Sequence, residues 1–420
     1  MQTVKQSDHR FLSESFKQDI PQSLTPSKSR FIGSILVVAG TTVGAGMLAL
    51  PMTSSRVGFI NSTLLLVAMW AFTCFTALLT LEINLRFGGG YSISYLAGKV
   101  FGRFGKWIAS LSMGLLFYAL LSAYATGGAS FLKEGFESIL GLHFPFSVMA
   151  LIFITMLGFF VYSSTRYVDY ANRLLLFFKM GIFFSLIYFL IPFIQTKCLT
   201  TTVGEYNALW LAIPIFFTSF GFHGSIPTLI NYVGPNPIYL RKVIIIGSLA
   251  PLVIYILWQT VTLGALPPST PGIVNAEEQN VAFFIRNLNE VTQRSTIGSF
   301  SNIFAFFGVS TSFLGVAIGL FDYLAESLKK SNNSIHRLQT ALLTFLPPLF
   351  FALFYPNGFI IALGYAAIAL SVLAVLLPAA IAYKLRQSNR ITMYKVIGGN
   401  ITLIFIFLCG LSIILAALHN

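Results

Sequence analysis

Eleven apolar runs of membrane-spanning length follow one another along this chain of 420 residues. Hydrophobic residues make up 56% of the sequence and charged residues only 9%, whereas soluble domains contain about 25% charged residues. A helical span needs about 20 apolar residues, and lipid offers no partner for backbone groups, so each run must be a helix. The sequence therefore predicts an all-α polytopic protein embedded in a lipid bilayer. The spans are expected at residues 31–54, 58–85, 107–131, 146–164, 173–195, 207–230, 243–265, 299–327, 338–355, 358–383 and 396–417.

Lys and Arg residues are unevenly divided between the two sides of these spans. If the N-terminus is cytoplasmic, the cytoplasmic segments hold 20 of the 26 and the outer segments hold five. Cytoplasmic segments of membrane proteins collect positive charge, so this split predicts a cytoplasmic N-terminus and an outer C-terminus. The same rule accounts for the net charge of +13, and the chain has no basic cluster with interleaved aromatics, so we expect no nucleic-acid binding.

Two further segments carry simple expectations. Residues 1–29 are polar and lack the apolar core of a signal peptide, which predicts a flexible cytoplasmic tail ahead of one transmembrane domain at 30–417. The outer segment 266–298, with Glu277 and Glu278, is expected to form a partly helical cap with a solvated surface. Cys74, Cys198 and Cys409 are too widely scattered for a metal site or a disulfide framework. We predict no metal and no cofactor.

The first span contains the polar stretch GTTVGAGMLALP, residues 40–51. Each glycine weakens a helix by roughly 1 kcal/mol relative to alanine, and unwound backbone inside a membrane must line a cavity or pack against protein. Part of the stretch matches the dinucleotide fingerprint G-x-G-x-x-G/A, but that fingerprint requires a strand before it and a βαβ unit around it. Here a proline and another span follow, and no Walker sequence is present. The stretch therefore predicts a broken helix.

The sixth span is interrupted in a similar way by the sequence IPIFFTSFGFHGSIPTL. The two breaks are five spans apart, and a repeat of five helices enters the membrane from opposite sides. Matching interruptions in two halves indicate a transporter site, which predicts an inverted repeat of residues 31–195 and 207–383 with an extra helix at 396–417. The alternative is that these small residues only allow close helix packing.

Two broken helices facing each other would suit an α-amino acid zwitterion. The N-terminus of the outer half of span 1 has free N–H groups and the positive end of the helix dipole, which can hold a carboxylate. Gly44 and Gly46 have no Cβ, so the backbone can approach a ligand. Carbonyl groups at the break in span 6 can accept hydrogen bonds from an ammonium group.

Four segments resemble the bacterial hydroxy/aromatic amino acid permeases, which are the tyrosine- and tryptophan-specific transport proteins of the amino acid–polyamine–organocation superfamily. They are GTTVGAGMLALP, LEINLRF after it, NRLLLFFKMG in span 5 and GLFDYLAES at the end of span 8. The resemblance covers residues 30–417. It implies the leucine-transporter fold, a place in the bacterial inner (cytoplasmic) membrane, and proton-driven import of an aromatic amino acid. No obligate protein partner is evident in the sequence. It does not identify which aromatic amino acid is carried.

Two other classes remain as alternatives. One is a sodium-coupled amino acid symporter or an exchanger, which would share the fold and the substrate site. The more remote one is an integral membrane enzyme, which needs convergent polar groups at one membrane face. The five histidines are scattered along the chain and on both sides of the membrane, which argues against an enzyme.

Candidate substrate-binding residues come from both breaks. Phe220 and Phe222 are candidates to stack on an aromatic substrate. His223 could relay protons or bind a substrate hydroxyl, or it could be a neutral histidine that caps freed carbonyls. Tyr118 and Tyr124 in span 3 could form a wall of the site, although simple packing is the stronger interpretation. The full candidate set is Thr41, Thr42, Gly44, Ala45, Gly46, Ser219, Phe220, Gly221, Phe222 and His223.

Lys179 is the one basic residue inside a predicted span, about seven residues or roughly 10 Å from its inner end. Such a residue either faces a cavity or a partner, or its long stem snorkels to the surface. The family resemblance implies a proton-coupling role beside spans 1 and 8. Its neighbours would then be residues 40–43 and the hydroxyls of Ser310, Thr311 and Ser312, which are possible ion-site residues. Glu82, Asp322 and Glu326, at inner span ends, are expected to pair with nearby Arg or Lys.

Overall fold

The structure is a computed structural model. It describes residues 28–163, 165–200, 206–266, 287–288, 290, 292–293, 295–328, 334–387 and 394–419. Residues 1–27 of the predicted tail and residues 267–286 of the predicted cap, with Glu277 and Glu278, lie outside the described residues.

Each of the eleven predicted spans coincides with one helix or with two or three consecutive helical segments. The first half consists of α2 (Lys28–Thr42), α3 (Gly46–Val57), α4 (Phe59–Arg86), α5 (Ile93–Leu140), α6 (Phe146–Ser163), α7 (Thr165–Leu190), η1 (Ile191–Phe193) and α8 (Thr196–Thr200). The second half consists of α9 (Tyr206–Thr218), η2 (His223–Ser225), α10 (Ile226–Val233), α11 (Pro237–Ala265), α13 (Ser295–Ser327), α14 (Ser334–Phe354), α15 (Phe359–Ser371), η4 (Val372–Leu376), α16 (Leu377–Arg386) and α17 (Asn400–Leu418).

Length and hydropathy support the predicted span count. Ten described helices are long and apolar enough to cross a membrane, or up to eleven when the bent pair α2 and α3 counts as one span. The described residues contain no strand. The all-α class is therefore confirmed.

Two helices extend beyond their predicted bounds. The helix α5 begins at Ile93 rather than near residue 107, and it turns sharply at Gly102, where φ is +69°. Glycine adopts this φ without steric cost. The charged residues around the turn lower the local hydropathy, so the first part of α5 was not included in the predicted span. The helix α7 begins at Thr165 rather than near residue 173. Lys179 therefore lies about 21 Å from the start of its helix, near the middle rather than 10 Å from the end.

Both predicted breaks are present. The pair α2 and α3 is bent by 54°, and residues 43–45 between them are not helical. The helix α9 ends at Thr218, and α-helix resumes only at Ile226 after a short 3₁₀ turn. A third irregularity was not predicted: residues 372–376 in the tenth span form a π-helix. Single π-helical turns inside helices often occur at functional sites.

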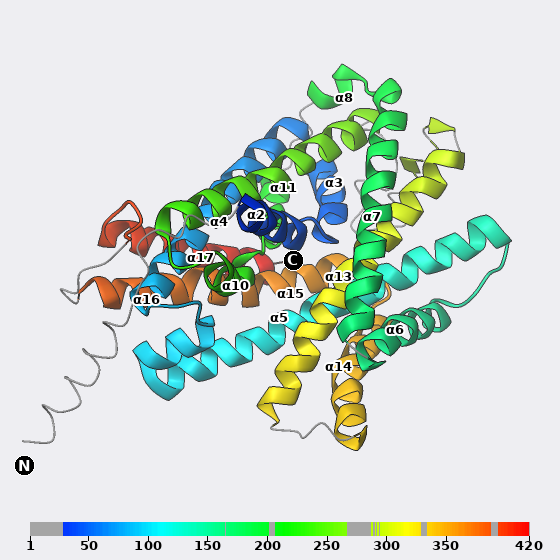
Figure 1. Ribbon diagram of the computed structural model, residues 1–420. Coiled ribbons are helices and arrows are strands. Elements are labelled where there is room, and N and C mark those ends of the chain that lie inside the picture. The colour runs from blue at the N-terminus through cyan, green and yellow to red at the C-terminus, as the bar shows by residue number, and fades with distance from the viewer. Residues whose placement is uncertain are drawn as a thin grey trace, which may run out of the picture.

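The helices form two groups that meet at the breaks. The helix α11 packs against α2, α3 and α4, whereas α13 packs against α5, α6, α7 and α14. Figure 1 shows α5, the longest helix of the described chain, running across the molecule beside α13 and α15. The helix α15 contacts α5, α9 and α17 and so joins the two groups. Most of the buried apolar side chains form a single cluster, which extends from α3 and α5 through α7, α11 and α13 to the start of α15.

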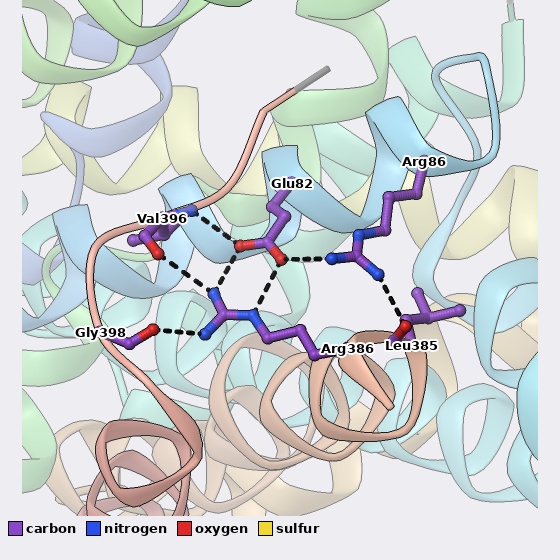
Figure 2. Close-up of polar contacts among 6 residues, drawn as sticks. All are labelled: Glu82, Arg86, Leu385, Arg386, Val396 and Gly398. Atoms are coloured by element: carbon purple, nitrogen blue, oxygen red, sulfur yellow. Dashed lines mark hydrogen bonds and ion pairs between the residues drawn. The ribbon is translucent and has the colours of Figure 1, made fainter. Parts of the chain in front are cut away.

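A buried ionic network fixes the ends of α4 and α16 (Figure 2). Arg386 donates to both carboxylate oxygens of Glu82, from Nε at 3.0 Å and from Nη2 at 2.6 Å. The Val396 N–H also donates to Glu82, at 2.8 Å, and Arg86 lies 3.4 Å from the carboxylate. The Arg386 guanidinium further donates to the Gly398 carbonyl. This network confirms the expectation that Glu82 pairs with nearby arginines.

Candidate functional site

A cavity of about 490 Å³ lies between the two breaks, within the range typical of small-molecule sites. Its lining comes from α2, α3, α5, α7, α9, α13 and α15. Ten candidate residues line it: Thr41, Thr42, Gly44, Ala45, Gly46, Lys179, Ser219, Gly221, Thr311 and Ser312. The fold thus brings together residues that are far apart in the sequence.

Four other candidates do not line this cavity. Phe220 is fully buried and packs edge-on against Tyr255, and Phe222 stacks on His223. The His223 ring nitrogen Nε2 lies 2.8 Å from the Thr76 hydroxyl on α4. Ser310 is buried one residue before Thr311. These side chains pack inside the protein around the breaks, and direct contact of any of them with substrate stays a prediction.

The first break presents unpaired backbone donors at the start of α3. The Ala45 N–H donates to the Ser312 hydroxyl at 3.0 Å. No described residue accepts a hydrogen bond from the N–H groups of Gly44 and Gly46. Free N–H groups at a helix N-terminus attract anions through their donors and through the helix dipole. This part of the cavity is suited to a carboxylate.

The two glycines of this break allow helices to approach each other. A Cβ on Gly44 would lie 2.6 Å from Ser312 Oγ, and a Cβ on Gly46 would lie 3.0 Å from Ser219 Oγ and 3.2 Å from Ser219 Cα. We expected Gly46 to leave room for a ligand. The structure corrects this reason, because Ser219 of the second break occupies the space beside Gly46.

Lys179 extends from α7 to the first break. Its side chain is only 2% exposed, and Nζ donates to the Val43 carbonyl at 3.1 Å and to Thr311 Oγ1 at 3.4 Å. The snorkelling alternative is therefore wrong, and the expected neighbourhood of spans 1 and 8 is confirmed at Val43 and Thr311. No described Asp or Glu pairs with this ammonium group. Its charge is held by neutral acceptors.

The remaining wall is mostly apolar. Tyr124 of α5 lines the cavity, whereas Tyr118 donates to the Leu343 carbonyl and lies outside the lining. Asn172 on α7 adds one polar side chain. Leucine and valine side chains complete the wall: Leu36, Val37, Leu116, Leu120, Leu176, Val316, Leu363 and Leu370. A lining that combines a polar break with leucine and valine side chains suits a ligand that has both charged groups and an apolar group.

Three polar side chains on α11 escaped the sequence analysis. The Tyr255 hydroxyl contacts the carbonyls of Thr42 and Ser219, at 2.6 and 2.9 Å. Ser248 accepts from the Trp70 indole at 3.1 Å, and Gln259 donates to a serine of α3, Ser54, at 2.7 Å. Tyr255 and Gln259 follow Ser248 by seven and eleven residues, so all three side chains lie on one helix face. That spacing, inside an otherwise apolar span, is the signal that could have identified them.

Comparisons with known proteins agree with this geometry. The tryptophan/tyrosine permease family matches residues 27–417. The tyrosine-specific transport system 1 of Haemophilus influenzae is 39% identical over 92% of this chain and 96% of its own length. The tryptophan-specific transport protein of the same organism is 35% identical, over 94% and 96%. The low affinity tryptophan permease of Escherichia coli strain K12 is 31% identical, over 92% and 94%.

Solved structures share the fold at low sequence identity. A mutant of the manganese transporter of Eremococcus coleocola aligns with a TM-score of 0.62 at 11% identity, over 95% of this chain and 88% of that one. A nucleobase-cation-symport-1 family transporter, in a closed conformation with bromovinylhydantoin bound, aligns with a TM-score of 0.61 at 14% identity, over 92% and 91%. The leucine-transporter-like fold, with its broken helix, is therefore present. With a family match across almost the whole chain, this protein is a permease rather than an enzyme and belongs to the tryptophan/tyrosine permease family.

Proposed function

We propose that this protein imports an aromatic amino acid, tyrosine or tryptophan, across the bacterial inner membrane. The observation that carries the proposal is the cavity between the two broken helices, whose lining combines unpaired N–H donors of the first break with leucine and valine side chains. Relatives that match over more than nine-tenths of the chain include tyrosine-specific and tryptophan-specific transport proteins. The fold-related structures include other transporters.

The substrate binds across both breaks in this proposal. Its carboxylate accepts from the N–H groups of Gly44 and Gly46 at the start of α3. Its ammonium group donates to backbone carbonyls of the break after α9, around Ser219 and Gly221. The aromatic ring lies against the leucine-rich wall formed by α5, α7 and α15. Phe220, Phe222 and His223 do not touch the substrate in this proposal; they pack behind the residues that line the cavity and hold them in place.

Transport proceeds by alternating access between the two halves, residues 31–195 and 207–383. The cavity lining supports an inward-facing arrangement. On α7 it reaches from Lys179 back to Asn172, and on α13 it reaches from Thr311 forward to Val316. Both directions lead to the side that holds the N-terminus, and the charge distribution predicts that side to be cytoplasmic. The C-terminus then lies on the periplasmic side.

Lys179 couples transport to protons. The protonated ammonium group links the Val43 carbonyl of the first break to Thr311 of α13. The neutral amine has one donor fewer and no charge, so it holds the same two acceptors less strongly. Gain and loss of this proton would therefore favour different placements of the broken helix against α13. Ser310 and Ser312 complete the polar neighbourhood.

Uptake into proteoliposomes tests the proposed substrate. We expect radiolabelled tyrosine or tryptophan to accumulate under an imposed inward proton gradient and to be displaced by aromatic rather than aliphatic amino acids. Accumulation that requires sodium instead would favour the alternative of a sodium-coupled symporter. Absence of aromatic amino acid uptake in correctly inserted protein would refute the proposal.

The variant Lys179→Met tests the coupling. Methionine keeps the length and loses the proton, so accumulation driven by a pH gradient should disappear while counterflow exchange of substrate persists. The matched control is Lys133→Met on α5, whose side chain is 41% exposed and whose ammonium group lies 3.7 Å from Glu137. Native accumulation by Lys179→Met would show that the proton is carried elsewhere.

A further inference from the structure

The Tyr255 hydroxyl lies between the ends of the two broken helices. Tyr255 is fully buried on α11, and its ring packs edge-on against Phe220 with 5.4 Å between ring centroids. The hydroxyl oxygen lies 2.6 Å from the carbonyl oxygen of Thr42, the last residue of α2. It also lies 2.9 Å from the carbonyl oxygen of Ser219, the first residue after α9. One side chain of a third, unbroken helix therefore contacts both breaks.

These two contacts compete for a single proton. A tyrosine hydroxyl has one O–H donor, whereas a carbonyl oxygen can only accept. At any moment the hydroxyl donates to one of the two carbonyls and only lies close to the other. If either helix end moves away, the hydroxyl retains a hydrogen bond to the remaining carbonyl, so the buried O–H group is never left without a partner.

The two carbonyls flank the two charged ends of the proposed substrate site. The donors Gly44 and Gly46 follow Thr42 by two and four residues, and Gly221 follows Ser219 by two. The distance between the carboxylate-binding and ammonium-binding backbone therefore depends on how Thr42 and Ser219 are held relative to each other. Tyr255 contacts both, and among the described residues no other side chain forms hydrogen bonds to both carbonyls.

We propose that Tyr255 is a positioning residue for substrate binding: its hydroxyl exchanges one hydrogen bond between the Thr42 and Ser219 carbonyls and thereby sets the separation of the two broken helices. This inference rests on the proposed aromatic amino acid transport. Tyr255 does not line the cavity, so it acts through the backbone that binds the substrate. It also explains why a fully buried polar group is kept on α11 at the level of the breaks.

The test is the variant Tyr255→Phe, which keeps the ring and its packing on Phe220. Both carbonyls then lose their shared donor, and the backbone that binds the zwitterion is no longer held in register. We expect KM for tyrosine or tryptophan to rise about tenfold, as for loss of one buried hydrogen bond. The maximal rate per correctly folded transporter should change much less.

The matched control is Gln259→Leu, one turn further along the same face of α11. Gln259 is equally buried, and its amide donates to Ser54 within α3 rather than to a break. We expect this variant to lower thermal stability as Tyr255→Phe does while leaving KM unchanged. An unchanged KM in Tyr255→Phe would overturn the inference. An equal rise in both variants would also overturn it, because it would reflect general loosening of α11.

A measurement on the wild-type protein covers the case in which Tyr255→Phe fails to fold. Hydrogen–deuterium exchange is followed in peptides that contain residues 40–48 and 216–224, over a titration with tyrosine or tryptophan. Coupled breaks should gain protection together, with the same midpoint concentration. Protection of only one break would overturn the inference. Absence of any binding or uptake by the wild type would instead refute the proposed function, so the two failures are distinguishable.

Discussion

The Glu82 network should contribute more to stability than any exposed ion pair of the described chain. The Glu82 side chain is 1% exposed and that of Arg386 is 5% exposed, and the carboxylate accepts two hydrogen bonds from Arg386 and one from the Val396 N–H. Glu82→Gln keeps the size of the side chain but removes the charge and directs an amide donor toward guanidinium donors. Loss of one partner of a buried ion pair costs about 3–5 kcal/mol.

The comparison variant is Glu137→Gln at the end of α5. Glu137 lies 3.7 Å from Lys133 and 3.5 Å from His143 Nδ1, and its side chain is 20% exposed, against 41% for Lys133 and 82% for His143. Exposed pairs contribute about 0–1 kcal/mol. The chemical change is the same at both positions. The predicted difference between the two variants is therefore at least about 2 kcal/mol in the free energy of unfolding, and it arises from burial.

Reversible unfolding in mixed micelles measures this difference, and a double-mutant cycle with Arg386→Gln isolates the pair. We expect the coupling free energy between positions 82 and 386 to exceed about 1 kcal/mol, as for side chains in one hydrogen-bond network. Additive effects of the two substitutions, or equal destabilisation by Glu82→Gln and Glu137→Gln, would refute the reasoning from burial.

Three further predictions concern transport. Gly315→Leu should lower uptake about tenfold, or ~1.4 kcal/mol, because the leucine would fill part of the cavity. Gly315 lines the cavity, and a Cβ there would meet no protein atom within 4 Å. The control is Gly181→Leu on α7, outside the lining, which should transport at nearly the wild-type rate. Gly46→Leu should abolish uptake without loss of membrane insertion, since its side chain would collide with Ser219, and near-normal uptake would contradict this packing. Deletion of residues 2–25, which lie outside the described residues, should leave uptake roughly unchanged, and a large loss in inserted protein would reveal a role for the tail.

The sequence predicted those features that depend on local composition. Both breaks were identified because glycine and proline weaken a helix wherever they occur, and the helices end there as expected, at Thr42 and Thr218. The helix bounds were less accurate where polar residues continue a helix beyond the apolar stretch, as at Ile93 of α5 and Thr165 of α7. Hydropathy marks the part of a helix that lies in lipid, and hydrogen bonding sets where the helix ends.

Features that depend on a distant partner were not predictable. The Ser371 hydroxyl, next to the π-helical turn at residues 372–376, donates to the Gly410 carbonyl of α17 at 2.8 Å, and the two residues lie 39 positions apart in the sequence. The spacing along α11 places Tyr255 on a polar helix face, but the contact of its hydroxyl with both breaks was not predictable, because the two acceptors lie 213 and 36 residues away in the sequence. A sequence shows which side chains are polar, but it does not show which backbone carbonyls lack a partner within their own helix after folding.

The glycines of the site illustrate this limit most clearly, because the same residue serves two opposite purposes. At Gly44 and Gly46 the missing Cβ makes room for protein, namely for Ser312 and Ser219. At Gly40 and Gly315 a Cβ would meet no protein atom within 4 Å, so the missing side chain leaves open space in the cavity. Substitution should therefore disturb the packing of the broken helices at the first pair and the volume open to substrate at the second. A sequence shows four equivalent glycines, and only their surroundings separate those that shape the protein from those that make room for its ligand.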